Sequence, residues 1–106
     1  MAQHSERTAG QVRGKVVGVL AGVLRWIGTL AAVLLTAHVL LTVFGANPDN
    51  PITTFVRSWA DPLALAFRDL FTPADAKLRV LANYGLAAVF WLVVTSIVVK
   101  LVRRLG

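Results

Sequence analysis

Two long apolar runs constrain this chain more than any other feature of its sequence. Residues 26–46 and 80–99 contain no Lys, Arg, Asp or Glu. Each run is close to the roughly 20 residues that a helix needs to cross about 30 Å of hydrocarbon. A soluble domain of 106 residues would struggle to bury the side chains of a sequence that is 57% hydrophobic. The sequence therefore predicts an all-α membrane protein, a two-transmembrane helical hairpin that crosses at residues 24–46 and 80–99.

The basic residues lie mainly at the outer ends of the two apolar runs. Four of the 11 precede residue 26, three follow residue 99, and four lie between the runs. Four aspartates balance the middle group, so the net charge of +6 belongs to the two ends. This distribution favours contact with anionic lipid headgroups over nucleic-acid binding. The positive-inside rule then predicts a multi-pass protein of the inner or plasma membrane with both termini in the cytoplasm.

The segment of residues 50–71, between the runs, has a helical apolar stripe. At 100° per residue, eight apolar side chains fall in an arc of roughly 120°, and Arg57, Asp61 and Arg68 lie opposite. Leu65 is the one large apolar residue outside the arc. Such a pattern between two membrane segments predicts amphipathic helices that lie flat at the membrane surface. The stripe consists of Ile52, Phe55, Val56, Trp59, Leu63, Ala66, Phe67 and Leu70.

Three prolines predict where the helices after the first run begin. Pro51, Pro62 and Pro73 are spaced by 11 residues, and each follows a residue type that caps helix N-termini well. Asp75 would then occupy the third position of the last helix and complete its cap. This pattern predicts interfacial helices over residues 51–60 and 62–71, with a kink at Pro62, and a long helix over residues 73–104.

The N-terminal part combines a polar tail with a glycine repeat. Residues 1–10 are polar, which predicts a flexible tail before a single membrane domain over residues 11–106. Gly14, Gly18 and Gly22 form two overlapping G-x-x-x-G patterns, which let two helix backbones approach closely. The alternative is that glycine is common in membrane helices and that this spacing is chance. The helix-packing candidates are Gly14, Gly18, Gly22 and Gly85.

His38 is the one histidine within an apolar run. A histidine inside a membrane is a candidate proton carrier, haem ligand or ion site. The alternative is a neutral side chain that bonds to a backbone carbonyl or to Thr42, Thr95 or Ser96. A haem would need a second axial ligand, and therefore a dimer with both His38 side chains facing each other. His38 is thus a weak cofactor candidate.

The sequence shows no set of catalytic residues. It has no cysteine, no His and carboxylate cluster at metal-ligand spacing, no nucleophile motif and no phosphate-binding loop. We therefore expect a protein that is not an enzyme and that holds no metal or cofactor. Asp61 and Arg68 are seven residues apart on one predicted helix face and could pair across the kink, the alternative being a solvated face without a site. The residues most suited to a partner surface are Phe55, Trp59, Asp61, Pro62, Phe67 and Arg68.

The same segment resembles the YggT family of small bacterial and plastid integral membrane proteins. The residues that match the family pattern are Asp61, Pro62, Leu63 and Arg68. Ala66 stands where the family usually has proline, Pro73 comes about one residue late, and the family's Asp-x-Ser-Pro stretch is missing. The resemblance covers about 25 residues. It implies a role in membrane organisation, in division or in cytochrome assembly.

These observations predict a protein that works by contact, as a scaffold or as an accessory subunit of a larger membrane complex. Its expected partners are a bilayer with anionic headgroups and either other membrane proteins or a second copy of the chain. One alternative is an oligomeric element for ion or proton transport that uses His38. The other is a haem or cytochrome assembly factor.

Overall fold

The computed structural model describes residues 2–106, with side chains from residue 8 onward. Its order of elements is α1 (Ala2–Val43), α2 (Pro51–Leu63), a short 3-10 helix (Leu65–Asp69) and α3 (Ala76–Arg103). No strand occurs within residues 2–106. The predicted all-α class is therefore confirmed.

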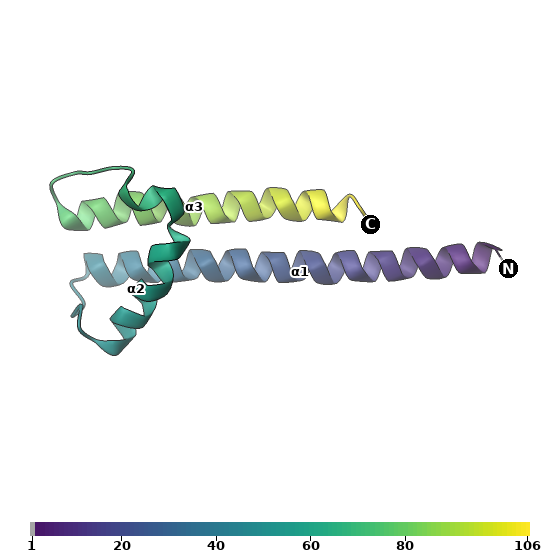
Figure 1. The fold of residues 1–106 in the computed structure, drawn as a ribbon, viewed down its shortest axis with the longest axis horizontal. Helices are drawn as coiled ribbons and strands as arrows, with labels where there is room; N and C mark the ends of the chain where they lie inside the picture. The colour runs from purple at the N-terminus through teal and green to yellow at the C-terminus, as the bar shows by residue number, and fades with distance from the viewer. Residues whose placement is uncertain (1) are drawn as a thin grey trace.

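The two long helices lie side by side and run in opposite directions (Figure 1). Val17 lies against Gly106, Gly28 against Thr95, and the ring of His38 against that of Tyr84. These three contacts show that α1 and α3 are antiparallel over their shared length. Because Gly106 lies level with Val17, the part of α1 before Val17 extends beyond the end of α3 (Figure 1).

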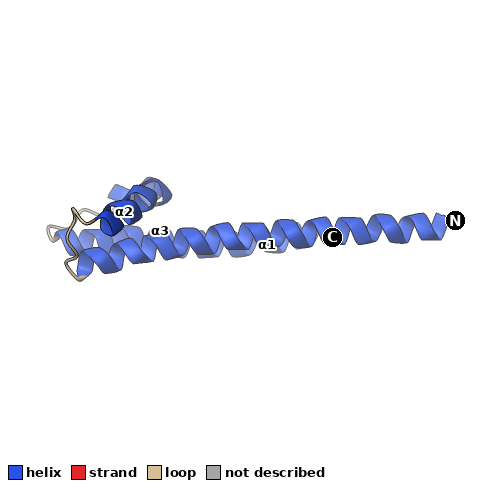
Figure 2. Cartoon of the chain, turned by 90° about the horizontal axis from the view of Figure 1, so that it is seen from below, coloured by secondary structure: helices blue, strands red, loops and turns tan. Residues whose placement is uncertain are grey.

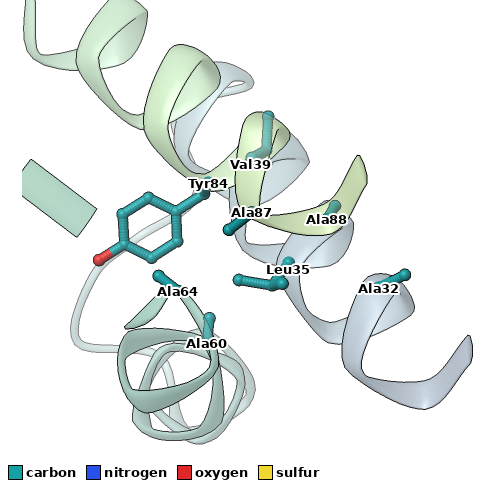
Figure 3. Packing of buried hydrophobic residues seen from close by; sticks show 8 residues of the cluster. All are labelled: Ala32, Leu35, Val39, Ala60, Ala64, Tyr84, Ala87 and Ala88. Atoms are coloured by element: carbon teal, nitrogen blue, oxygen red, sulfur yellow. The ribbon is translucent and has the colours of Figure 1, made fainter. Parts of the chain in front are cut away.

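The α2 helix lies across one side of the pair formed by α1 and α3 (Figure 2). The three helices meet in a small core made largely of alanine, which lets their backbones approach closely. In Figure 3 the Tyr84 ring lies beside this core, and its hydroxyl points out of it. The core residues are Ala32, Leu35, Val39, Ala60, Ala64, Tyr84, Ala87 and Ala88.

Both long helices are long and apolar enough to cross a membrane. The candidate spans are Thr8–Val43 and Ala76–Arg103, and only 22% and 17% of their most apolar windows are buried inside the structure. A core helix of a soluble protein would bury most of that surface. The outward apolar surface therefore favours association with a membrane.

α1 differs from the prediction at both ends. It begins at Ala2, so the prediction of a flexible tail over residues 1–10 is wrong for residues 2–10, and Met1 lies outside the described residues. It ends at Val43, three residues before the predicted end at residue 46. Gly45 has a positive φ of 73°, and Ala46 N–H donates to Leu41 C=O at 2.8 Å. This is a Schellman motif, in which a left-handed glycine ends the helix.

α2 confirms the predicted start at Pro51 but not the predicted break at Pro62. The Asn50 side chain accepts a hydrogen bond from Ile52 N–H at 2.9 Å, and Pro51 occupies the first turn. The helix then runs through Pro62 to Leu63, so the prediction of a new helix over residues 62–71 is wrong. Pro62 cannot donate to Ser58 C=O, and the helix ends one residue later.

The connecting segment breaks at Leu65 instead, which has a positive φ of 54°. A left-handed backbone costs a residue with a side chain about 1–2 kcal/mol. Leu65 is also the residue that did not fit the predicted stripe. The misfit is explained because the helix does not continue through it.

α3 begins at Ala76, three residues after the predicted start at residue 73. Asp75 is its N-cap, and its Oδ1 accepts from Lys77 N–H at 2.8 Å and from Leu78 N–H at 3.4 Å. The backbone of Phe71 cannot join a helix, because its N–H and C=O both bond to the buried Asn83 side chain at 2.8 Å. The N-cap bonds of Asp75 therefore set the start of α3, and the bonds of Asn83 hold the segment before it against the helix. The helix ends at Arg103, close to the predicted end at residue 104.

Candidate functional site: a polar cavity under α2

A cavity lies between α2, the end of α1 and the start of α3, with a volume of about 380 Å³. This volume falls within the range of small-molecule sites, roughly 300–1,000 Å³. Apolar side chains from α1, α3 and the loop after α1 form part of its wall. Its polar wall residues are His38, Thr42, Thr53, Arg57, Asp61 and Tyr84.

Tyr84 and Asp61 form the central polar contact of this cavity. The Tyr84 hydroxyl donates to Asp61 Oδ1 with 2.6 Å between the oxygens. Hydrogen bonds to a carboxylate are shorter and stronger than those between neutral groups. The bond therefore ties α2 to α3 and fixes where the carboxylate lies.

Two further polar side chains of α3 hold the connecting segment in place. Trp91 Nε1 donates to Leu63 C=O at 2.7 Å, and the fully buried Asn83 binds the backbone of Phe71. Trp91 satisfies a carbonyl at the end of α2, and Asn83 satisfies both backbone groups of Phe71 after the 3-10 helix. α2 and the segment that follows it are therefore held against α3 at Asp61, Leu63 and Phe71.

His38 lies at the inner end of the cavity, and only 7% of its surface is exposed. Its ring centroid is 4.6 Å from that of Tyr84, and its buried Nδ1 has no hydrogen-bond partner. The structural alternative predicted a hydrogen bond between His38 and a backbone carbonyl, Thr42, Thr95 or Ser96. Within the described residues, His38 forms none of these bonds. A buried polar atom without a partner costs about 1–3 kcal/mol.

Arg57 lies one helical turn before Asp61 on α2 and lines the same cavity. Within the part of the chain that the structure describes, it forms no ion pair with Asp61 or with another acidic side chain. The predicted pair of Asp61 and Arg68 is also wrong, because Arg68 lies 4.0 Å from Asp69. Asp69 pairs more closely with Arg79, at 3.1 Å.

The predicted apolar stripe of α2 divides into two faces. Val56 is buried, as is Ala60, which lies outside the predicted stripe, whereas Ile52, Phe55 and Trp59 are 69%, 60% and 52% exposed. The Phe55 and Trp59 rings lie edge to face, with 6.5 Å between their centroids. Large apolar side chains therefore remain uncovered on the outside of α2. We call these three residues the outer face of α2.

The other predicted partner residues lie in different environments. Phe67 packs inside the molecule against Phe90, with 5.0 Å between ring centroids. Asp61 is committed to Tyr84, whereas Pro62 and Arg68 are exposed. Only Phe55 and Trp59 of the six therefore form one continuous apolar surface.

The predicted helix-packing glycines do not pack within this chain. A Cβ placed on Gly14, Gly18, Gly22 or Gly85 would meet nothing within 4 Å. A Cβ on Gly28 would instead clash with Thr95. The sequence analysis did not select Gly28, because it lies outside the G-x-x-x-G repeat. Packing of the other four glycines on a second chain stays a prediction.

Sequence reasoning also missed Tyr84 as a member of the site. The available signal was a phenol within an apolar run, because a buried hydroxyl needs a polar partner. Among the described residues, no three His, Cys, Asp or Glu side chains come together as metal ligands do. His38, Asp61 and Arg57 instead line one cavity with polar or charged side chains.

No family model, curated protein or solved structure that was compared with this chain matches it. The likeness to the YggT family therefore depends on the short segment around Asp61 and Arg68 alone.

Proposed function

We propose that this protein is an integral membrane protein with two crossings that works by contact with another membrane protein, as a scaffold or an accessory subunit. In this proposal α1 and α3 form a transmembrane hairpin with both ends in the cytoplasm, and α2 lies near the outer surface. Division, membrane organisation and cytochrome assembly, which the YggT likeness implies, are the settings in which such contacts would serve.

The positions of the basic residues support the membrane placement. Gly28 and Thr95 touch, and Arg25 and Lys100 lie three and five residues beyond them on the same end of the pair. At 1.5 Å per residue, both side chains start within about 8 Å of one level. Long basic side chains at such a level reach the headgroups at one boundary of the hydrocarbon.

The outer face of α2 is the observation that supports the contact role. Phe55 and Trp59 protrude from a helix that is held in place by small buried residues and by the hydrogen bonds of Tyr84 and Trp91. Rigid aromatic side chains on a fixed element are typical anchors of protein interfaces, because little freedom is lost when they bind.

A co-purification experiment tests this role. The chain is extracted in a mild detergent, and the membrane proteins that accompany it are identified by quantitative mass spectrometry. We expect F55A/W59A to lose these proteins. The matched control V89A/L92A changes two exposed side chains of α3 and should retain them. Unchanged recovery with F55A/W59A would show that the outer face of α2 is not the contact surface.

Proton or ion transport is the second candidate, and the unpartnered Nδ1 of His38 is the observation that favours it. α1 and α3 touch directly at Gly28 and Thr95, so a continuous path would need several copies of the chain. Proton flux into liposomes that His38→Ala abolishes would support this function. Absence of flux in the intact protein would exclude it.

A further inference from the structure

Two charged groups that line the cavity under α2 have unused bonding capacity. Arg57 has no ion pair, and Asp61 uses only Oδ1 in its bond with Tyr84. The Nδ1 of His38 also has no partner, but this atom is buried and has almost no accessible surface. These statements hold for residues 8–106, whose side chains the structure describes. Arg57 and Asp61 are one turn apart on α2 and still do not bind each other. Opposite charges at this spacing usually attract.

A ligand with two opposite charges would satisfy both groups. A guanidinium binds phosphoryl oxygens through parallel hydrogen bonds. A carboxylate oxygen accepts hydrogen bonds, and a primary ammonium has three to donate. From this arrangement we infer that the cavity binds a phosphoryl group joined to a primary ammonium, with the phosphoryl at Arg57 and the ammonium at Asp61.

The surroundings of the cavity favour the headgroup of an aminophospholipid as the source of this chemistry. The cavity lies at the end of α1 and the start of α3, where both apolar runs meet the connecting segment. Leu41, Ala46 and Val80 give part of its wall an apolar character that suits the glycerol end of a lipid. The inference depends on the membrane placement proposed above, and not on the contact role of the outer face of α2.

A lipid series on the unmodified protein provides the first test. The protein in mild detergent is offered equal amounts of phosphatidylethanolamine, its N-methylated derivatives up to phosphatidylcholine, and phosphatidylglycerol. Bound lipid is then counted by native mass spectrometry. Each methyl group removes one donor, so we expect retention to fall stepwise, by about tenfold over the series, which is typical of losing charge-assisted hydrogen bonds. Equal retention of all these lipids would overturn the inference.

Substitutions within the cavity provide the second test. Asp61→Asn keeps an acceptor for Tyr84 but removes the negative charge, and should abolish the preference for phosphatidylethanolamine over phosphatidylcholine. Arg57→Gln should weaken retention of both lipids. Arg68→Gln and Asp69→Asn are matched controls on the same connecting segment, outside the cavity, and should retain the preference. An unchanged preference in Asp61→Asn, with the helix content intact, would overturn the inference. If that variant does not fold, the lipid series decides.

Soluble phosphoethanolamine separates the two sources of this chemistry. Failure to displace the lipid at equal concentration supports the lipid headgroup. Displacement of the lipid by phosphoethanolamine would mean that the cavity recognises the same two groups in a free solute. A chain that stays in vesicles but retains every lipid equally would overturn this inference alone. A chain that leaves vesicles and stays in solution without detergent would overturn the membrane placement as well.

Discussion

Tyr84 of α3 donates a hydrogen bond to Asp61 of α2, with 2.6 Å between the hydroxyl oxygen and Oδ1. The two residues are 23 positions apart, and neither lies in a repeat or motif that would pair them. The bond places a carboxylate beside an apolar pair of helices and holds α2 across them. Both the cavity and the outer face of α2 depend on that position.

Tyr84→Phe should loosen α2. The variant keeps the aromatic ring but removes the donor, so Asp61 loses its partner at a cost of about 1–3 kcal/mol. We expect the amides of α2 to exchange hydrogen roughly ten times faster or more, measured by hydrogen exchange with mass spectrometry in detergent micelles. Asp49→Asn, which changes an exposed carboxylate outside the cavity, is the control. Equal exchange rates in Tyr84→Phe and the native chain would contradict a supporting role for this bond.

Gly28→Ala should separate the two long helices. The added Cβ would clash with Thr95, and overpacking of this kind typically costs about 1–3 kcal/mol. Gly22→Ala is the matched control, since its Cβ meets nothing within 4 Å, and alanine favours a helix by about 1 kcal/mol over glycine. The chain has no cysteine, so V17C/G106C introduces a single pair across the contact between Val17 and Gly106. Disulfide formation by this pair should decrease with Gly28→Ala and persist with Gly22→Ala.

Asp75→Ala should shorten α3, whereas Thr72→Val should not. Asp75 accepts hydrogen bonds from two backbone amides, and loss of an N-cap typically costs about 1 kcal/mol. The Thr72 side chain makes no hydrogen bond within the part of the chain described by the structure. Thermal unfolding in detergent, followed by circular dichroism, measures both effects. A larger loss for Thr72→Val would restore the helix start predicted at residue 73.

Trp59 should lie near the lipid headgroups. The difference in fluorescence between the native chain and Trp59→Phe reports on this one site and leaves the bond of Trp91 to Leu63 intact. In the proposed orientation, lipids brominated near the headgroup should quench it more strongly than lipids brominated at the chain end, because α2 lies at the membrane surface. Stronger quenching by the deeper bromines would mean that α2 lies inside the hydrocarbon.

The ends of the chain should lie on one side of the membrane. A cysteine placed at Ala74, in the exposed segment before α3, should react with an impermeant thiol reagent added to intact cells. A cysteine placed at Gly106 should react only after the membrane is made permeable. The opposite pattern would reverse the orientation that the distribution of basic residues predicts.

Local signals in the sequence predicted local structure well. The start of α2 follows from Asn50 and Pro51, because an N-cap bonds to an amide only two residues away. The same reasoning failed at residue 73, because the amides of the first turn bond to Asp75 and not to Thr72. It failed again at Pro62, where the helix continues to Leu63 and the chain turns at Leu65. Both errors arise where more than one residue of the segment is able to end or begin a helix.

The candidate site was predictable only in part. His38 stood out because a titratable ring within an apolar run is costly. The sequence pattern places Arg57 and Asp61 opposite the apolar stripe, but periodicity cannot say which side of an amphipathic helix meets the rest of the protein. The structure turns α2 so that Val56 and Ala60 face inward and Asp61 reaches Tyr84. The small side chains of Ala60 and Ala64 let this side of α2 pack against the core. A hydrophobic pattern does not single out alanine, so it does not predict this rotation.

The unequal lengths of α1 and α3 have a mechanical consequence. Gly106 lies beside Val17, so among the described residues the stretch of α1 from Ala2 to that level has no neighbouring helix and is about 22 Å long. In the proposed orientation this part of α1 would extend into the cytosol beyond the inner headgroups, while the end of α3 would stay close to them. A reporter fused to the amino end would therefore sample the cytosol at a fixed height, and the same reporter on the carboxyl end would rest on the bilayer.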